Sequence, residues 1–204
     1  MVEIKGFIPV SLIDYPSKVC SVLFLGGCNF RCPWCHNFDL VDEKSLNKIK
    51  TIPFENILSF IEKRKGKIDG ICISGGEPTI NGDYLIDFIR DLRRNKILIK
   101  LDTNGSNPKV IEKLIEENLI DFVSLDIKNI PEKYPETIGL KNFDFSIIVE
   151  TLKLIKNSGI EFQTRTTLVN NLVYKEEIEE LAKKLDIDIT FQEYRVKRII
   201  NSIG

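Results

Sequence analysis

The sequence lacks the features that would direct it to a membrane, to export or to a nucleic acid. Its 29 basic and 30 acidic residues give a net charge of −1, which provides no general attraction to nucleic acid or to an anionic surface. No apolar run approaches the ~20 residues that a membrane-spanning helix needs. The amino terminus has no basic segment followed by an apolar core. We therefore expect a cytoplasmic protein that binds neither membrane nor nucleic acid.

The chain has a single histidine, and its cysteines are unevenly placed. There are five cysteines in all, and three of them, Cys28, Cys32 and Cys35, lie in one short segment. An odd number with this clustering favours metal binding over a disulfide framework. Cys20 and Cys72 lie inside apolar runs, where we expect small buried side chains. Because no second cysteine cluster remains, we expect no auxiliary metal centre.

The spacing C-x3-C-x2-C provides three thiolates for one metal centre, and not four. A cubane iron–sulfur cluster that only carries electrons normally takes four cysteines, and a structural zinc site is usually closed by four protein ligands. Three cysteines leave one iron open to a substrate. His36, the single histidine, directly follows Cys35, so we do not expect it to be a fourth ligand of the same metal. The missing ligand is the first indication of catalysis.

The residues around these cysteines resemble a known family. C-x3-C-x2-C is the signature of the radical S-adenosylmethionine (SAM) enzymes, and residues 14–16, 24–27 and 35–37 resemble the opening of the glycyl-radical enzyme activases. The resemblance implies a [4Fe–4S] cluster on Cys28, Cys32 and Cys35 whose open iron chelates SAM. It also implies reductive cleavage of SAM to methionine and a 5′-deoxyadenosyl radical, which takes hydrogen from a glycine Cα of a partner enzyme. Ser17 departs from the family's Asp-x-Pro-Gly.

The resemblance extends over most of the chain, from residue 14 to about residue 192. It implies a glycyl-radical enzyme as partner, of the anaerobic ribonucleotide reductase or pyruvate formate-lyase type, and flavodoxin or ferredoxin as electron donor. Two alternatives stay open. A compact radical SAM enzyme acting on a small molecule, similar to 7-carboxy-7-deazaguanine synthase, typically has Asp-Thr after the last cysteine, where this chain has His36 and Asn37. A non-catalytic zinc or iron protein needs a fourth ligand that we do not find.

Strand-like and helix-like segments alternate along the chain. They predict one α/β domain over residues 1–204, with its core at about 14–192 and the cluster loop at 26–37. The expected strands are residues 19–25, 70–74, 97–102, 121–127, 160–168 and 187–192, with helices between them. Six such units in a row predict parallel strands with right-handed crossovers.

Helix boundaries are marked at two places. Asn107 followed by Pro108 predicts a helix start, and Gly159 predicts a helix end. The helical spacing of apolar residues predicts one helix over residues 85–92 and another over 178–185. Residues 38–53 are the hardest segment to assign, and they can be the tail of the cluster loop.

The predicted strands alternate between apolar and polar side chains, whereas parallel strands covered on both faces are usually apolar throughout. In residues 121–128, one face carries Val123, Leu125 and Ile127, and the other carries Ser124, Asp126 and Lys128. Helices pack on apolar surfaces, so the polar face is expected to line an interior. We predict an incomplete (β/α)6 TIM-type barrel of parallel strands, the radical SAM core, with a polar lumen; the alternative is polar edges that face solvent. The cluster loop then lies on the carboxyl-terminal rim, where barrel enzymes place their chemistry.

Further candidate residues lie near the cluster loop and at the end of the second strand. Gly75 and Gly76 have no side chains, so a ligand can approach the backbone closely. With Glu77 they match the family's Gly-Gly-Glu motif, which implies that they bind the amino group of SAM. The resemblance also places His36 beside the cofactor. Trp34 is expected to shield the cluster and the adenine, with plain packing as the alternative.

Two carboxylates, Asp102 and Asp126, share the inner face of neighbouring strands. Carboxylates this close need a cation, a proton or a lysine between them, and Lys128 is one candidate. The resemblance implies that Asp102, Thr103 and Asp126 hold a monovalent cation beside the SAM carboxylate. It also implies that Lys128 contacts the cofactor or the partner's glycine loop. The alternative is an internal salt bridge.

A guanidinium lies on the same polar face at Arg165. It suits a carboxylate or the ribose edge of the cofactor, and the family activases have an arginine in the matching strand. The alternative is an ion pair with Glu161 or Asp126. The family also carries a late cofactor-contacting histidine, which this chain lacks, and Gln192 is the candidate replacement.

Overall fold

The computed structural model describes residues 2–194, and these form one seven-stranded sheet whose strand order follows the chain. Each strand from β2 to β7 pairs in parallel with the next. The strands are β1 (Ile4–Ser11), β2 (Cys20–Leu25), β3 (Gly70–Gly75), β4 (Leu98–Thr103), β5 (Phe122–Asp126), β6 (Glu161–Leu168) and β7 (Ile189–Glu193). The six strands expected from the sequence are confirmed to within two residues at each end.

The sequence analysis misses β1, which is antiparallel to β2 and forms one edge of the sheet. Its ladder is irregular, with register shifts between Ile4 and Gly6 and between Ile8 and Ser11. Most of its residues are half-buried or exposed, so it shows no clean alternation of apolar and polar positions. The predicted parallel set is therefore correct for β2 to β7 and is extended by one antiparallel strand.

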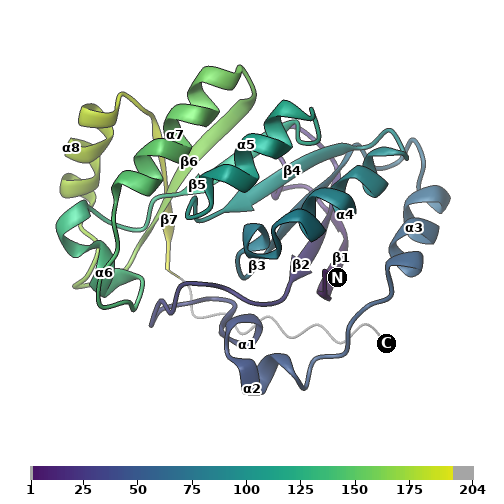
Figure 1. Cartoon of the computed structure of the whole chain (residues 1–204), viewed down its shortest axis with the longest axis horizontal. Helices are drawn as coiled ribbons and strands as arrows, with labels where there is room; N and C mark the ends of the chain where they lie inside the picture. The colour runs from purple at the N-terminus through teal and green to yellow at the C-terminus, as the bar shows by residue number, and fades with distance from the viewer. Residues whose placement is uncertain (1, 195–204) are drawn as a thin grey trace.

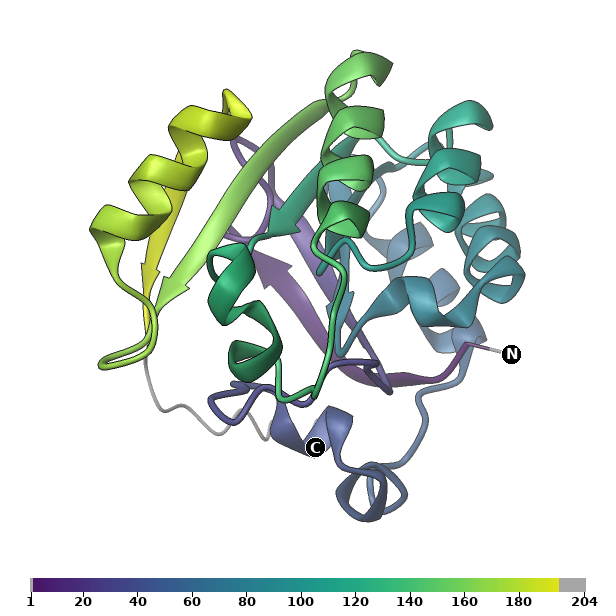
Figure 2. The same cartoon turned by 60° about the vertical axis from the view of Figure 1, so that its left-hand side comes forward.

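Most of the long helices connect successive parallel strands and lie on the outer side of the sheet (Figures 1 and 2). They are α3 (Phe54–Lys63), α4 (Asp83–Arg93), α5 (Pro108–Glu116), α7 (Ser146–Ser158) and α8 (Lys175–Leu185). The predicted boundaries hold, since Pro108 opens α5 after Asn107, and Gly159 ends α7 with a φ of 74°.

Short helices occupy the segments near the carboxyl-terminal ends of the strands. They are α1 (Phe38–Val41), α2 (Glu43–Leu46), η1 (Pro78–Asn81), η2 (Pro131–Lys133) and α6 (Tyr134–Thr137). Residues 38–53, which the sequence left open as a loop tail, therefore contain α1 and α2 directly after the cluster loop.

The hydrophobic core lies between the outer face of the sheet and these helices. Ile99, Leu101, Val123 and Leu125 are completely buried, as the apolar parity of β4 and β5 predicts. The opposite face is polar toward the carboxyl-terminal ends of the strands. At the amino-terminal ends a second apolar cluster of Tyr15, Cys20, Val22, Cys72 and Phe122 covers it. The lumen thus has an apolar floor and a charged upper part.

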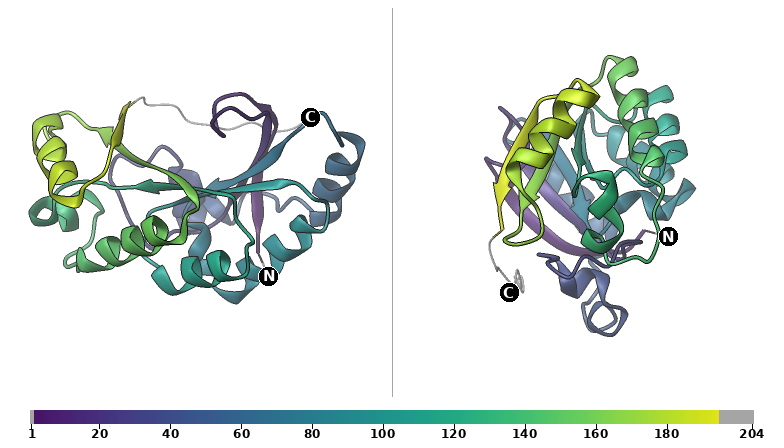
Figure 3. Two further views of the ribbon diagram at one scale, coloured as in Figure 1. Left: turned by 90° about the horizontal axis from the view of Figure 1, so that it is seen from above. Right: turned by 90° about the vertical axis from the view of Figure 1, so that its left-hand side faces the viewer.

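The sheet curves into an arc and does not close, as the left view of Figure 3 shows. Among residues 2–194, β1 and β7 are the two edges and do not pair with each other. This is the incomplete barrel that the sequence predicts, with one side left open. None of the helices that the structure describes is long and apolar enough to span a membrane.

Candidate functional site

The cluster loop, residues 26–37, follows β2 and crosses the carboxyl-terminal ends of the strands. Two backbone hydrogen bonds fix its start to the end of β3: Gly76 N donates to Leu25 O (3.0 Å) and Glu77 N donates to Gly27 O (2.8 Å). A Cβ on Gly76 would lie 1.8 Å from Gly27 O. The glycine pair therefore lets the loop pack directly against the end of β3, whatever contact it makes with a ligand.

The middle of the loop is anchored to α6 and the residues after it. Phe30 is 2% exposed, and its ring packs edge-on against Phe143 at 5.3 Å. Arg31 N donates to Ile138 O (2.7 Å), and Trp34 Nε1 donates to Thr137 O (3.0 Å). These contacts hold the loop as part of the folded core.

The three cysteines of the loop are half-buried free thiols. Burial raises the pKa of the Cys28 thiol to about 12, and burial also raises the pKa values of Cys32 and Cys35, against the opposing effect of Lys128. A bound metal centre would displace these protons, because thiolates are the ligand form. Phe30 N donates to Cys28 Sγ (3.3 Å), a contact that suits a thiolate.

Three thiolates on one loop are the donor set of an iron–sulfur cluster. In the part of the chain that the structure describes, no three His, Cys, Asp or Glu side chains surround one position for a single metal ion. The fit of Cys28, Cys32 and Cys35 to a cluster therefore rests on their chemistry and spacing.

Two ring side chains of the loop, Trp34 and His36, contact Tyr194 at the end of the edge strand β7. Lys128 Nζ lies over the Trp34 ring, 5.4 Å from its centroid, and the His36 ring stacks on Tyr194 with centroids 5.0 Å apart. Burial, followed by the charge of Lys128, lowers the pKa of His36. The structure thus places Trp34 and His36 near Lys128, and their predicted contacts with the cofactor stay predictions.

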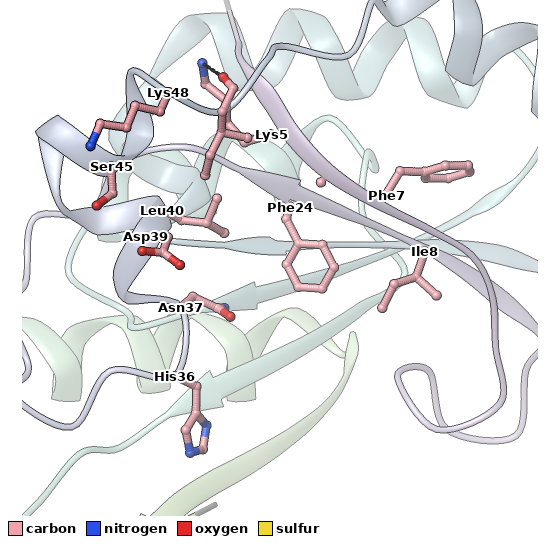
Figure 4. A pocket seen from close by; sticks show the side chains of 12 residues that line it. Lys5, Phe7, Ile8, Phe24, His36, Asn37, Asp39, Leu40, Ser45 and Lys48 are labelled. Atoms are coloured by element: carbon pink, nitrogen blue, oxygen red, sulfur yellow. Dashed lines mark hydrogen bonds between the residues drawn. The ribbon is translucent and has the colours of Figure 1, made fainter. Parts of the chain in front are cut away.

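A cavity of about 380 Å³ lies between the cluster loop, β1, β2, α1 and α2 (Figure 4). Its walls include Gly6, Ile8, Phe24, Asn37, Leu40 and Lys48. Asn37 is fixed toward the strands because its Nδ2 donates to Gly75 O (3.0 Å). The cavity surface is mostly apolar, and His36 of the cluster loop forms part of its wall beside the edge strand β1.

The carboxylate of Glu77 is turned into the protein and is 1% exposed. Its Oε1 accepts from Thr79 N (3.0 Å) and from Thr103 Oγ1 (2.8 Å), and its Oε2 accepts from Asn104 N (2.6 Å). Burial raises the pKa of this carboxyl, and the hydrogen bonds oppose the rise. Glu77 therefore ties the end of β3 to the end of β4. Its predicted contact with the SAM amino group stays a prediction.

Five charged side chains form a row across the lumen, which we call the charge row: Lys100, Asp102, Arg165, Asp126 and Lys128. Lys100 Nζ contacts Asp102 Oδ1. Arg165 bridges the two carboxylates, with Nη1 3.6 Å from Asp102 Oδ1 and Nε 2.8 Å from Asp126 Oδ1. Lys128 Nζ lies 3.0 Å from Asp126 Oδ2. The cations and carboxylates therefore alternate along the row.

Within the charge row, Asp126, Lys128 and Arg165 shift one another's pKa values. Burial alone would raise the pKa of Asp126, but Arg165 and Lys128 hold it well below its usual range. Burial alone would lower the pKa values of Lys128 and Arg165, but Asp126 raises both. All three groups are therefore charged near neutral pH. The ion pairs given above as an alternative for Lys128 and Arg165 are present, and Arg165 pairs with Asp126 and Asp102 rather than with Glu161.

The sequence analysis missed two residues of this site, Lys100 and Asn104. The structure also separates Thr103 from Asp102, which were predicted to act together. Lys100 lies two residues before Asp102 on β4 and so on the same face of the strand, a pattern that could have identified it from the sequence. Asn104 gave no signal, although its backbone N–H donates to Glu77 Oε2 (2.6 Å) and its side-chain Nδ2 donates to Asn29 Oδ1 of the cluster loop (3.0 Å). Thr103 points away from Asp102, to the opposite face of β4, where it meets Glu77. Gln192 is exposed on the edge strand β7.

Comparisons with known proteins agree with this geometry. The family model of the Radical SAM superfamily matches residues 22–185. A provisionally assigned glycyl-radical enzyme activating enzyme of Methanocaldococcus jannaschii is 37% identical over 190 residues, which are 91% of this chain and 77% of that protein. The pyruvate formate-lyase-activating enzyme of Clostridium pasteurianum is 29% identical, over 89% of this chain and 75% of that protein.

Solved structures show the same fold. Native anSMEcpe with bound AdoMet superimposes with a TM-score of 0.65 at 23% identity, over 83% of this chain and 50% of that one. TYW1 with a lysine-pyruvate adduct superimposes with a TM-score of 0.63 at 21% identity, over 89% of this chain and 66% of that one. The present chain is thus shorter than both. The family model covers most of this chain and the archaeal relative is matched along most of its length, so the chain belongs to the radical SAM superfamily of oxidoreductases and, within it, to the glycyl-radical enzyme activating enzymes.

Proposed function

We propose that this protein generates a glycyl radical on a partner enzyme. The observation that carries the proposal is the anchored loop with three cysteines and no fourth, in a chain 37% identical to a relative assigned as an activating enzyme. Cys28, Cys32 and Cys35 would hold a [4Fe–4S] cluster. When bound, the cluster and SAM supply the electron transfer and the radical chemistry, and the protein supplies binding, orientation and exclusion of water.

The residues of the lumen are suited to hold a zwitterionic cofactor. The charge row contains three cations and two carboxylates, so it carries one positive charge in excess. Lys128 and Arg165 are the members of this row that would attract the carboxylate of the cofactor. Trp34 lies against Lys128 and would cover the adenosyl side. Gly75 and Gly76 would contact the amino group of the cofactor through their backbone at the end of β3, as the family's Gly-Gly-Glu motif implies.

The open side of the barrel supports a protein substrate. A closed barrel would admit a small molecule, whereas a glycine in another protein must reach the lumen as part of a loop. The sheet does not close between β1 and β7, and a cavity of about 380 Å³ lies at the edge strand β1 beside the cluster loop; both support such a path. A glycyl-radical enzyme of the ribonucleotide reductase or pyruvate formate-lyase type is our proposed partner.

The conditions of action follow from the same chemistry. Five free thiols and an oxygen-sensitive cluster suit a reducing, anaerobic cytoplasm. The electron is proposed to come from flavodoxin or ferredoxin, as in the family.

The test begins with SAM cleavage by anaerobically reconstituted, reduced protein. We expect 5′-deoxyadenosine from the wild type and from Cys20→Ala, a buried cysteine outside the loop, but none from Cys32→Ala. Absence of 5′-deoxyadenosine from the wild type would refute the enzymatic proposal.

The second step mixes the active protein with candidate glycyl-radical enzymes and records electron spin resonance spectra. A glycyl-radical signal that depends on SAM identifies the partner. Cleavage of SAM without a radical on any candidate would favour the small-molecule alternative instead.

A further inference from the structure

The charge row is complete without an added ion. In the part of the chain that the structure describes, it joins three cations to two carboxylates through contacts from β4, β5 and β6. Both oxygens of Asp126 face a cation, Arg165 at Oδ1 and Lys128 at Oδ2. At Asp102, Lys100 and Arg165 both face Oδ1. The carboxylates that the family resemblance assigns to a monovalent cation are therefore already neutralised by side chains.

Lys100 is the unusual member of the row. It is completely buried, and its Nζ contacts Asp102 and lies 3.6 Å from Cys72 Sγ, above the apolar floor of the lumen. A buried ammonium is costly unless it is paired and hydrogen-bonded. This position therefore commits Lys100 to Asp102, and it puts a fixed positive charge where a bound cation would otherwise balance that carboxylate.

The third residue expected to hold the cation is not available on the lumen side. Thr103 Oγ1 donates to Glu77 Oε1 (2.8 Å) and accepts from Gly105 N (3.1 Å), on the face of β4 opposite to Asp102. A further monovalent cation would then have few free oxygen ligands. It would also enter a row that already carries one excess positive charge, which opposes its binding. The residues present do not fit the cation.

We propose that Lys100 replaces the monovalent cation as a built-in counter-ion of Asp102, so that this protein binds SAM without Na⁺ or K⁺. Lys100 is in this sense a positioning residue: it keeps Asp102 neutralised and the charge row in place beside the cofactor. The inference depends on the use of SAM and is independent of which partner receives the radical.

The first test uses the protein without cofactor, so it stands apart from any activity. Thermal unfolding is measured in NaCl, KCl and choline chloride at equal ionic strength. The wild type should melt at the same temperature in all three salts. The Lys100→Met variant should be stabilised by Na⁺ or K⁺ in a saturable way, since a cation can then reach Asp102. At ten times its Kd, a cation would favour the folded state about 11-fold, a rise in Tm of about 3–6 °C for a chain of this size.

Lys113→Met is the matched control, because Lys113 makes an ion pair with Asp83 at the surface and should leave the three salts equivalent. A saturable stabilisation of the wild type by Na⁺ or K⁺ would overturn the proposal, even where Lys100→Met fails to fold. A folded Lys100→Met that gains no cation dependence would overturn it as well.

The second test measures SAM affinity of the cluster-loaded protein by equilibrium dialysis. The wild type should bind SAM equally well in choline and in Na⁺ or K⁺. Lys100→Met should bind about tenfold more weakly in choline and recover when Na⁺ or K⁺ is added, a coupling of ordinary size between two sites. A simple structural defect would lower the affinity in every salt alike, and that result would contradict the counter-ion role.

Discussion

Glu77 shows how a residue can match a family motif and also hold the fold together. Its carboxylate accepts hydrogen bonds from Thr79, Thr103 and Asn104, and it is buried. Every group that faces it is a donor. A carboxylate can satisfy all of them, whereas an amide brings its own N–H groups. The identity of this residue is therefore set by its neighbours before any cofactor binds.

Glu77→Gln should lower the free energy of unfolding by about 1–3 kcal/mol, because the amide N–H₂ would face the donor of Asn104 or Thr103. The measurement is urea unfolding of the protein without cofactor, with the midpoint falling and the slope unchanged. Glu112→Gln, an exposed position of α5, is the control and should be neutral. Equal midpoints for wild type and Glu77→Gln would show that this carboxylate does not join β3 to β4.

The cluster loop is an element held by close backbone packing rather than by regular secondary structure. Gly76 touches Gly27 at the start of the loop. Gly139 touches the middle of the loop, where a Cβ on Gly139 would lie 2.1 Å from Arg31 O. The glycines at these two contacts have no room for a side chain. The position of Cys28, Cys32 and Cys35 thus depends on residues that lie far from them in the sequence.

Gly76→Ala should displace the loop, lower stability by about 1–3 kcal/mol through overpacking, and abolish the cluster. Iron and sulfide per chain after anaerobic reconstitution measure the second effect. Gly66→Ala is the control, because Gly66 has a φ of +73° but no atom within 4 Å of the added Cβ. It should cost about 1–2 kcal/mol through backbone strain and keep full iron content. Normal iron in Gly76→Ala would contradict the packing role.

The charge row links three strands, and its energetics depend on pH. The pKa of Asp126 is lowered in the folded protein, so its contribution to stability is present above the unfolded value of about 3.9 and is lost as pH falls through the lowered folded value. The pKa of Lys128 is raised, so its contribution is present below the unfolded value of about 10.4 and is lost as pH rises through the raised value.

Asp126→Asn should destabilise the protein at pH 7 by about 3 kcal/mol, near the lower end for a broken buried pair because Asp126 is 26% exposed. The difference from the wild type should shrink as pH falls below about 4. Guanidinium unfolding across the acid range measures it, with the exposed Asp83→Asn as control. A difference that stays constant down to the acid limit would mean that Asp126 is not held ionised by Arg165 and Lys128.

At the scale of the whole molecule, the single tryptophan lies in the cluster loop and is 8% exposed. The loop is anchored by Phe30 and by the hydrogen bond from Trp34 to Thr137. The loop and the barrel should therefore unfold together, even without the cluster.

Thermal unfolding followed by tryptophan fluorescence and by far-ultraviolet circular dichroism should give coincident transitions, as expected for a single cooperative domain. Phe30→Ala should separate them, since the loop would lose its anchor while the sheet remains. A fluorescence transition that precedes the other in the wild type would show that the loop unfolds on its own.

Much of this architecture could be predicted from the sequence. The alternation of apolar and polar residues in 121–128 is a local pattern, and it correctly indicated both the strand and its two faces. Pro108 and Gly159 marked helix ends for equally local reasons. By contrast, most side chains of β1 are half-buried or exposed, and its ladder with β2 is irregular. Its sequence therefore shows no alternation that would predict a strand.

The sequence by itself determined the chemistry available: three thiolates in one loop, glycines after the second parallel strand, and charged residues on one parity of the inner strands. These depend on residue type and spacing, which need no tertiary contact. Only the tertiary structure decided which charges meet. Arg165 on β6 meets Asp102 on β4 and Asp126 on β5. Glu77 turned toward Thr103 because the partners of a buried polar group come from segments distant in the chain.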